Sequence, residues 1–288
     1  MQIASAYIRG KSHLMFGLCI LFTAVILAVL GMVSGYLISL GYKSVDFALF
    51  TQLPVPAGAL GFPGGLQNGI VGSIIMIALA SLIGIPIGML TGIYLAEYSS
   101  RAWLAGPVRF IADVLTGVPS IVVGILGYEL LVVPLGTYNG WAGAAALAFI
   151  MIPLVARTTE EMLLLVPRGY REASVALGAT KARTILRVVV PAAFGSVITG
   201  IMLAIARVAG ETAPLLFTAL GSRFLESNPS RPFPSLTVQI YHAAMEPYKE
   251  ENRKAWAGIL VLLALIFVLN VTVRLTMRAS GYGARAAR

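Results

Sequence analysis

Long stretches without a charged side chain constrain this chain more than any other feature. The run from Leu14 to Leu40 has no Asp, Glu, Lys or Arg, and a second uncharged run extends from Gly69 to Ala96. A helix of about 20 apolar residues crosses the hydrocarbon core of a bilayer. The chain is 58% hydrophobic and 11% charged, whereas soluble domains carry about one quarter charged residues. These observations predict an all-α integral membrane protein.

Six transmembrane helices account for the apolar segments. The first run is much longer than the roughly 7–15 apolar residues of a signal-peptide core, so we expect it to be retained as a span. The third segment, between Asp113 and Glu129, is interrupted by Pro119. The remaining predicted spans begin at Trp141, cover Val188–Leu220, and cover Ala255–Val273.

The distribution of Lys and Arg predicts the orientation of these spans. Of the 21 basic residues, 14 fall at the termini and in the loops that six spans place on one side, and six fall on the other. Cytoplasmic loops carry the excess of Lys and Arg. We therefore expect residues 1–13 and the basic tail 279–288 to be cytoplasmic, around one permease domain at 14–278. In that domain the loop at about 157–191 is cytoplasmic and the loop at about 221–254, with a short amphipathic helix near Leu236–Ala244, is extracytoplasmic.

The longest polar stretch in the middle of the chain, residues 167–191, predicts two short helices. Pro167 suits the first position of a helix, where its missing N–H has no cost. Gly178 stands where a helix C-terminus favours a left-handed residue. Thr180 can then cap a second helix.

The spacing of residues in this loop resembles the EAA loop of type I ABC importer permeases. Glu172-Ala173-Ser174 is followed after three residues by Gly178, and after nine more by Val-Val-Val-Pro191. The resemblance implies that this cytoplasmic coupling helix docks on an ATPase subunit. The residues carried over to that role are Arg171, Glu172, Ala173 and Gly178. A hairpin whose basic residues only set topology is the alternative.

Two charged residues lie inside the fifth predicted span. Arg207 and Glu211 are four residues apart, which would place them on one helix face. Pro214 has no N–H for the Gly210 carbonyl, so we expect a helix break beside both charges. Charged groups at membrane depth usually face a protein interior or a water-filled path. A self-neutralising ion pair is the structural alternative.

Several sequence blocks resemble the A-type permease of phosphate-specific ABC importers, the PstA family. They include Arg-Val-Ala-Gly-Glu-Thr-Ala-Pro at 207–214, Thr-Gly-Val-Pro-Ser at 116–120 and Arg-Thr-Thr-Glu-Glu at 157–161. The resemblance implies a substrate pathway that includes Arg207, Glu211, Thr212 and Arg157. Guanidinium groups suit phosphate oxygens because they donate in a bidentate fork. The Glu160–Glu161 pair is interpreted as a solvated face.

The implied function is that of a permease subunit in an ATP-driven importer of inorganic phosphate, in a bacterial or archaeal plasma membrane. The resemblance implies a sister permease, two ATPase subunits and an extracytoplasmic phosphate-binding protein as partners. The sequence has no P-loop motif, so we expect a transport subunit without its own ATPase site, and we predict no metal, cofactor or nucleic acid. A permease for another oxyanion is the main alternative, ahead of an intramembrane enzyme or a proton-coupled carrier.

Overall fold

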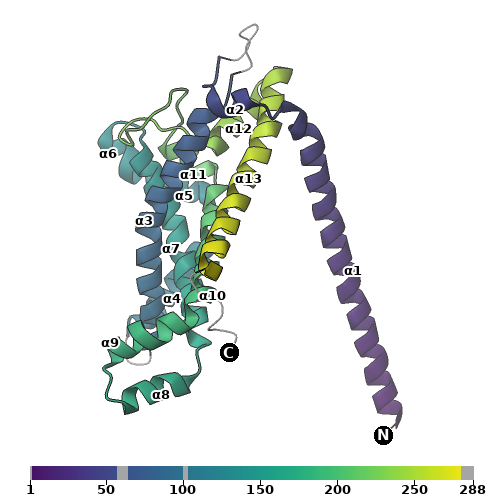
Figure 1. The fold of residues 1–288 in the computed structure, drawn as a ribbon, viewed down its shortest axis with the longest axis vertical. Coiled ribbons are helices and arrows are strands. Elements are labelled where there is room, and N and C mark those ends of the chain that lie inside the picture. The colour runs from purple at the N-terminus through teal and green to yellow at the C-terminus, as the bar shows by residue number, and fades with distance from the viewer. Residues whose placement is uncertain (1, 57–63, 100–102, 280–288) are drawn as a thin grey trace.

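The computed structural model describes residues 2–56, 64–99 and 103–279, and these residues form an α-helical fold (Figure 1). By length and composition, five described helices can cross a membrane, and one bent helix pair makes a sixth span. The six-span prediction is therefore confirmed at this level. The helices are α1 (Gln2–Gly41), α2 (Phe47–Thr51), α3 (Gln67–Tyr98), α4 (Ala105–Gly117), α5 (Ser120–Gly127), α6 (Val133–Leu135), α7 (Gly140–Leu164), α8 (Arg168–Ala176), α9 (Lys181–Thr184), α10 (Val190–Ala209), α11 (Ala213–Thr218), α12 (Leu236–Met245) and α13 (Lys249–Ala279).

The centre of the fold is the pair formed by α3 and α7. Glycines at four-residue intervals on α3 bring the two backbones close together. A Cβ on Gly88 would lie 2.7 Å from the Cβ of Val155, and a Cβ on Gly92 would lie 2.5 Å from the carbonyl oxygen of Ala156. Met151 and Val155 are fully buried at this contact. Small residues are typical of helix interfaces in membranes, because there lipid provides no hydrophobic force that drives helices together.

The third span is broken rather than kinked. The helix of α4 and the helix that runs from α5 to α6 meet at Val118–Pro119 with a bend of 104°. A π-helical turn at Tyr128–Val132 joins α5 to α6. Arg109 lies inside α4, because that helix begins at Ala105.

The fifth span is also shorter than predicted, because α10 ends at Ala209 and α11 is a separate helix. The predicted loop at 221–254 contains the expected short helix, α12, and ends earlier than predicted, since α13 begins at Lys249. The predicted basic tail lies outside the described residues beyond Ala279.

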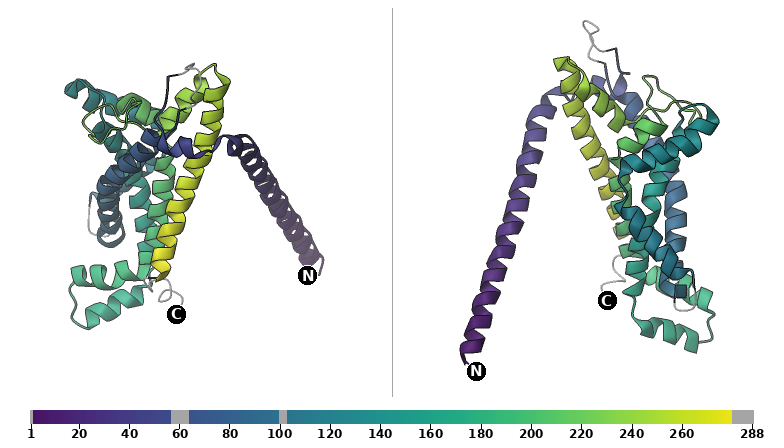
Figure 2. Two further views of the ribbon diagram at one scale, coloured as in Figure 1. Left: turned by 45° about the horizontal axis from the view of Figure 1, so that its top comes forward. Right: turned by 180° about the vertical axis from the view of Figure 1, so that it is seen from behind.

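The loops gather at two opposite ends of the molecule. Figure 1 shows α8 and α9 at the end where α1 begins and α13 ends, and α2, α6 and α12 at the other end. Both views in Figure 2 show α1 leaning away from the other helices, with only its C-terminal end close to α13. There Tyr36 packs edge-on against Trp256, with ring centroids 5.8 Å apart.

Candidate functional site

Arg207 lies in the last turn of α10, immediately before the break in the fifth span. Glu211 follows the end of that helix, so the two residues do not share a face of one continuous helix as predicted. Their side chains still approach, with Arg207 Nε 4.0 Å from Glu211 Oε1. The Arg207 side chain is 52% exposed and that of Glu211 is 15% exposed. The pair is therefore loose, and it is the one ion pair of Arg207 in the described part of the chain.

The break itself differs in detail from the predicted one. The amides of Gly210 and Glu211 donate to the carbonyls of Arg207 and Val208, at 3.2 and 3.1 Å, which closes α10 with a tight turn. Pro214 stands in the first turn of α11, where a helix needs no N–H donor. The structure thus has a break near Pro214, where one was predicted. It separates two helices, α10 and α11, instead of interrupting a single helix. Thr212 is the residue that precedes α11.

Helix α12 packs over this break. Thr237, in its first turn, donates a hydrogen bond from its hydroxyl to the carbonyl oxygen of Glu211 at 3.0 Å. The amide of Leu236 donates to the buried Ser73 hydroxyl of α3 at 2.8 Å. The start of α12 therefore fixes the backbone of the break to the central helix pair.

A small cavity of about 10 Å³ lies beside Arg207. Its walls come from the end of α4, the break before α5, and the middle of α7. Pro119 is the cap residue that precedes α5, and the positive end of that helix dipole faces the same space as Arg207, since Ser120 lines it. A cavity of this size holds about one water molecule. The lining residues are Leu115, Thr116, Val118, Ser120, Val123, Phe149, Ile150, Leu154 and Arg207.

Arg157, the second predicted pathway arginine, is engaged with carboxylates. Its Nε donates to Glu161 Oε1 at 2.9 Å, and its Nη1 lies 3.6 Å from Asp113 Oδ1. Glu160 is not part of a solvated face, which corrects the interpretation from sequence: it is 2% exposed and accepts a 2.9 Å hydrogen bond from Arg109 Nε. This buried ion pair connects α7 to α4. Separating the two helices would leave the Glu160 carboxylate buried without a partner, which would cost free energy.

The loop between α7 and α10 has the predicted two-helix form. Gly178 adopts a φ of +82°, and the Thr180 hydroxyl accepts a hydrogen bond from the Arg183 amide. Pro167 precedes α8 as its cap instead of occupying the first helical position. The hydroxyls of Ser174 and Thr184 lie 2.9 Å apart and connect the two helices.

The end of α3 holds this loop in place. Arg171 donates to Glu97 Oε1 at 2.7 Å and to the carbonyls of Leu163 and Val166 at 2.9 and 2.6 Å. Lys181 donates to the carbonyl of Glu97 at 2.6 Å and lies over the ring of Tyr98. Both helices of the loop are thus anchored on the last turn of α3.

The side of the loop that faces away from the spans is exposed. Glu172, Ala173 and Gly178 are all exposed, and Leu177 is 89% exposed. Val175 is an exposed apolar side chain on the same loop. Apolar side chains presented in this way outside the spans are typical of a contact surface for another protein.

Sequence reasoning missed several residues that shape this arrangement. Glu97 was not singled out from the sequence, although a carboxylate at the end of a span near a basic loop is a signal for an ion pair. Asn68 and Gln239 hydrogen bond to each other at 2.7 Å across α3 and α12, and no local pattern indicated this contact. Among the described residues, no group of three or more His, Cys, Asp or Glu could hold a metal ion.

Comparison with known proteins places this geometry in a family. Residues 84–279 match the model described as "Binding-protein-dependent transport system inner membrane component". The chain is 46% identical to the Yersinia pestis protein named phosphate transport system permease protein PstA, over 81% of this chain and 79% of that protein. The Haemophilus influenzae protein of the same name is 42% identical over 92% of this chain and 94% of its own length.

Solved structures support the fold independently. A chain from an inward-facing structure of the MetNI methionine ABC transporter superposes with a TM-score of 0.62 at 21% identity, and the alignment covers 74% of this chain and 95% of that one. At this identity the likeness concerns the fold alone, which is that of a type I importer permease. The chain belongs to the family of binding-protein-dependent inner-membrane transport components, together with the PstA permease proteins.

Proposed function

We propose that this chain is one of two transmembrane permease subunits of an ATP-driven importer of inorganic phosphate, and that phosphate passes Arg207. The names of the relatives from Yersinia pestis and Haemophilus influenzae support the substrate. The observation that carries the proposal is the loose Arg207–Glu211 pair at a helix break, beside the start of α5. In transporters, broken helices direct their positive N-terminal ends toward anionic substrates near the middle of the membrane.

The constriction at Arg207 fits a gate better than a resting binding site. The space beside the guanidinium is about 10 Å³, so a phosphate ion enters only after α4, α5 and α10 move apart. Glu211 and Thr212 follow in the break. There they provide polar partners for Arg207 in apolar surroundings, and the anion can replace these partners at the guanidinium. Arg157 supports the wall of the passage through Asp113 and the acidic residues of α7.

The energy for opening comes from partner subunits in this proposal. The exposed face of α8, with Glu172, Ala173 and Leu177, docks on one of two ATPase subunits. Gly178 fixes the turn after α8, and Arg171 transmits movement of the loop to α3 through Glu97. A sister permease completes the pathway, and an extracytoplasmic phosphate-binding protein delivers the substrate to the end of the molecule that carries α12.

The proposed orientation places the start of α1, the loop from α8 to α9, and the end of α13 in the cytoplasm. Support comes from the excess of basic residues in these segments and from their common position at one end of the fold. The proposed location is the plasma membrane of a prokaryote, with both termini cytoplasmic and residues 14–278 as the membrane domain.

Uptake of labelled phosphate into cells without other phosphate importers tests the role of Arg207. The double variant Arg207→Gln/Glu211→Gln removes the pair without leaving an unpaired charge. A hydrogen bond to a charged group contributes about 1.5–3 kcal/mol, so uptake should fall by roughly 10- to 100-fold. Arg207→Lys should also be impaired, because an ammonium group cannot reproduce the bidentate fork.

The matched control is Arg253→Gln/Glu250→Gln, which removes an exposed ion pair in the first turns of α13. It should transport normally at equal expression. Normal uptake by the Arg207/Glu211 variant, with an intact complex and wild-type transport confirmed, would reduce this pair to a structural role. Failure of the wild-type complex to transport phosphate, with uptake of another oxyanion, would refute the proposed substrate.

A further inference from the structure

Arginines in and near the spans differ in their ion-pair partners. Arg109, Arg157 and Arg171 each have a carboxylate oxygen within 3.0 Å. In the described part of the chain, the ion pair of Arg207 is the distant one with Glu211. Arg274, near the end of α13, forms no ion pair with any side chain in the described part of the chain, and it is exposed. A guanidinium without a carboxylate partner is available to donate charge-assisted hydrogen bonds to an anion.

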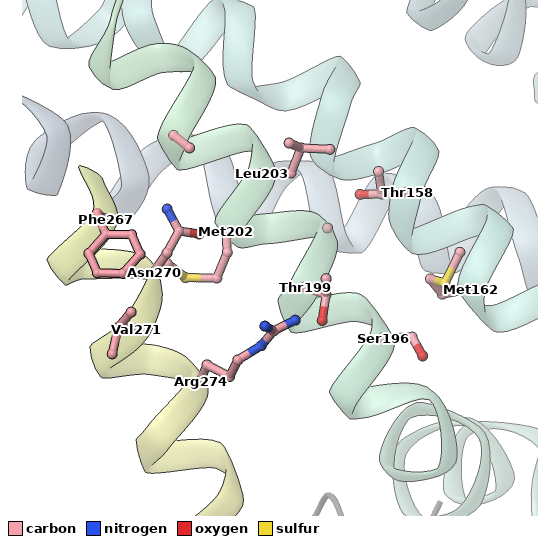
Figure 3. Close-up of a pocket in the computed structure, with 12 residues that line it drawn as sticks. Thr158, Met162, Ser196, Thr199, Met202, Leu203, Phe267, Asn270, Val271 and Arg274 are labelled. Atoms are coloured by element: carbon pink, nitrogen blue, oxygen red, sulfur yellow. The ribbon is translucent and has the colours of Figure 1, made fainter. Parts of the chain in front are cut away.

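Arg274 borders a cavity with a volume of about 760 Å³ between α7, α10 and α13. Figure 3 shows its guanidinium extending from α13 across the cavity toward Thr199 on α10. Phe267, Met202 and Leu203 form much of the apolar wall. An apolar wall lowers the local dielectric constant, so it strengthens the attraction between the guanidinium and an anion.

This cavity lies one helical turn from the small cavity beside Arg207. Leu154 lines the small cavity, and Thr158, one turn further along α7, lines the large one. On α10, Arg207 lines the small cavity and Leu203, one turn away on the same face, lines the large one. Arg207 and Arg274 therefore border neighbouring cavities, of which the one at Arg207 is narrow and the one at Arg274 is wide.

The polar groups of the wide cavity are few, and most are used within their own helices. The hydroxyls of Thr158 and Thr199 donate to carbonyls of α7 and α10. The amide of Asn270 donates to the carbonyl of Ile266 at 2.8 Å. In the described part of the chain, the Ser196 hydroxyl has no hydrogen-bond partner. Arg274, with help from Ser196, is thus the main donor available to an anion in this space.

We infer that Arg274 is a second anion-binding residue, which receives phosphate from Arg207 and releases it on the side of the membrane where α8 and α9 lie. This inference rests on the proposed function. Transport requires sites that bind strongly enough to admit an ion and weakly enough to release it, and several sites in series meet both demands. Arg274 fits the release step because its site is wide, exposed and poor in further donors.

Thiol labelling of the full transporter complex tests binding without relying on activity. In a Cys19→Ser background, Ser196→Cys places a thiol of similar size beside Arg274. Inside-out vesicles of zwitterionic lipid are treated with an impermeant maleimide, with and without inorganic phosphate. Phosphate should slow labelling by about fivefold, the net effect of one hydrogen bond of ordinary strength at a partly hydrated site. The protection should disappear in Arg274→Gln, and Thr272→Cys on the outer face of α13 should show none.

Uptake measurements separate this inference from the proposed function. Arg274→Gln should lower the maximal rate of phosphate uptake by about fivefold, whereas Arg253→Gln should leave it unchanged. If Arg207 variants lose uptake while Arg274→Gln keeps both normal uptake and phosphate protection, the release site is refuted and the proposed function stands. If wild-type vesicles transport no phosphate, the proposed function fails first.

A lipid headgroup could supply the same phosphate chemistry, so the vesicle composition distinguishes the two sources. Slower labelling in vesicles with phosphatidylglycerol, together with no effect of inorganic phosphate in zwitterionic vesicles, would assign the cavity to lipid and overturn the inference. Protection by inorganic phosphate in zwitterionic vesicles, lost with Arg274→Gln, supports it.

Discussion

Helix α1 and helix α7 are both long enough to span a membrane, but they relate to the rest of the protein in opposite ways. Among the five candidate spans, α1 is the most apolar, and none of its most apolar stretch is buried within the protein. The least apolar is α7, and 67% of the corresponding stretch is buried. In a membrane, apolar character alone places a helix in lipid. Small side chains and paired charges determine which helices pack against each other.

The glycines of α3, which face α7, and the glycines of α1 show the physical reason for this difference. Gly84, Gly88 and Gly92 of α3 each face α7 at distances that leave no room for a side chain. In contrast, Gly17, Gly31 and Gly35 of α1 have no atom of the described chain within 4 Å of an added Cβ. The three glycines of α3 therefore allow close packing against α7, whereas the three glycines of α1 do not serve a helix contact within the described chain. The neighbouring helix distinguishes the two cases, and the glycine spacing does not.

The largest expected effect tests the packing side of this comparison. In Gly88→Leu, the added Cβ would overlap Val155, and the carbonyl oxygen of Ile152 would lie 2.9 Å away. Because backbone cannot move aside easily, we expect a loss of about 3 kcal/mol or more, enough to prevent a stable fold. Thermal unfolding and size-exclusion chromatography in detergent measure it. Gly31→Leu in α1 is the control and should behave as wild type. An equal loss from both substitutions would remove the distinction between the helices.

A smaller effect is expected where charge, rather than packing, holds a segment to α3. Glu97→Gln removes the carboxylate that binds Arg171 and should loosen the loop of α8 and α9. The Glu97 side chain is 7% exposed and that of Arg171 is 22% exposed, so the loss should be about 2 kcal/mol, below that of a fully buried pair. Trypsin cleavage of the loop in inside-out vesicles should accelerate. Glu250→Gln, from an exposed pair, should leave the rate unchanged, and unchanged cleavage in Glu97→Gln would show that Lys181 alone holds the loop.

The smallest effect concerns the aromatic contact of Tyr36 in α1 with Trp256 in α13. A double-mutant cycle with Tyr36→Ala and Trp256→Ala should give a coupling energy of about 0.5–1.5 kcal/mol, as for other edge-on aromatic pairs. Phe22→Ala, on an exposed part of the same helix, should show no coupling with Trp256→Ala. The measurement is thermal unfolding of the detergent-solubilised subunit. A coupling well above this range would mean that α1 is part of the packed body.

Much of the candidate site was predictable because its signals are local. The left-handed Gly178 and the Thr180 cap depend on adjacent residues, and the structure has both. The break near Pro214 was also expected, but its position was not, because the tight turn at Gly210 and the hydrogen bond from Thr237 depend on α12. Glu160 was misplaced on a solvated face, since its partner Arg109 is 51 residues away along the chain.

The sequence by itself determined that this chain spans a membrane about six times and carries a two-helix polar loop. Uncharged runs and turn residues are properties of short segments, and a bilayer sorts them by composition. Tertiary structure alone decided which glycines pack and which arginines are neutralised. It also decided that Arg207 and Arg274 border neighbouring cavities. These outcomes depend on residues far apart in the chain, since a charge is paired or left free only when distant helices meet around it.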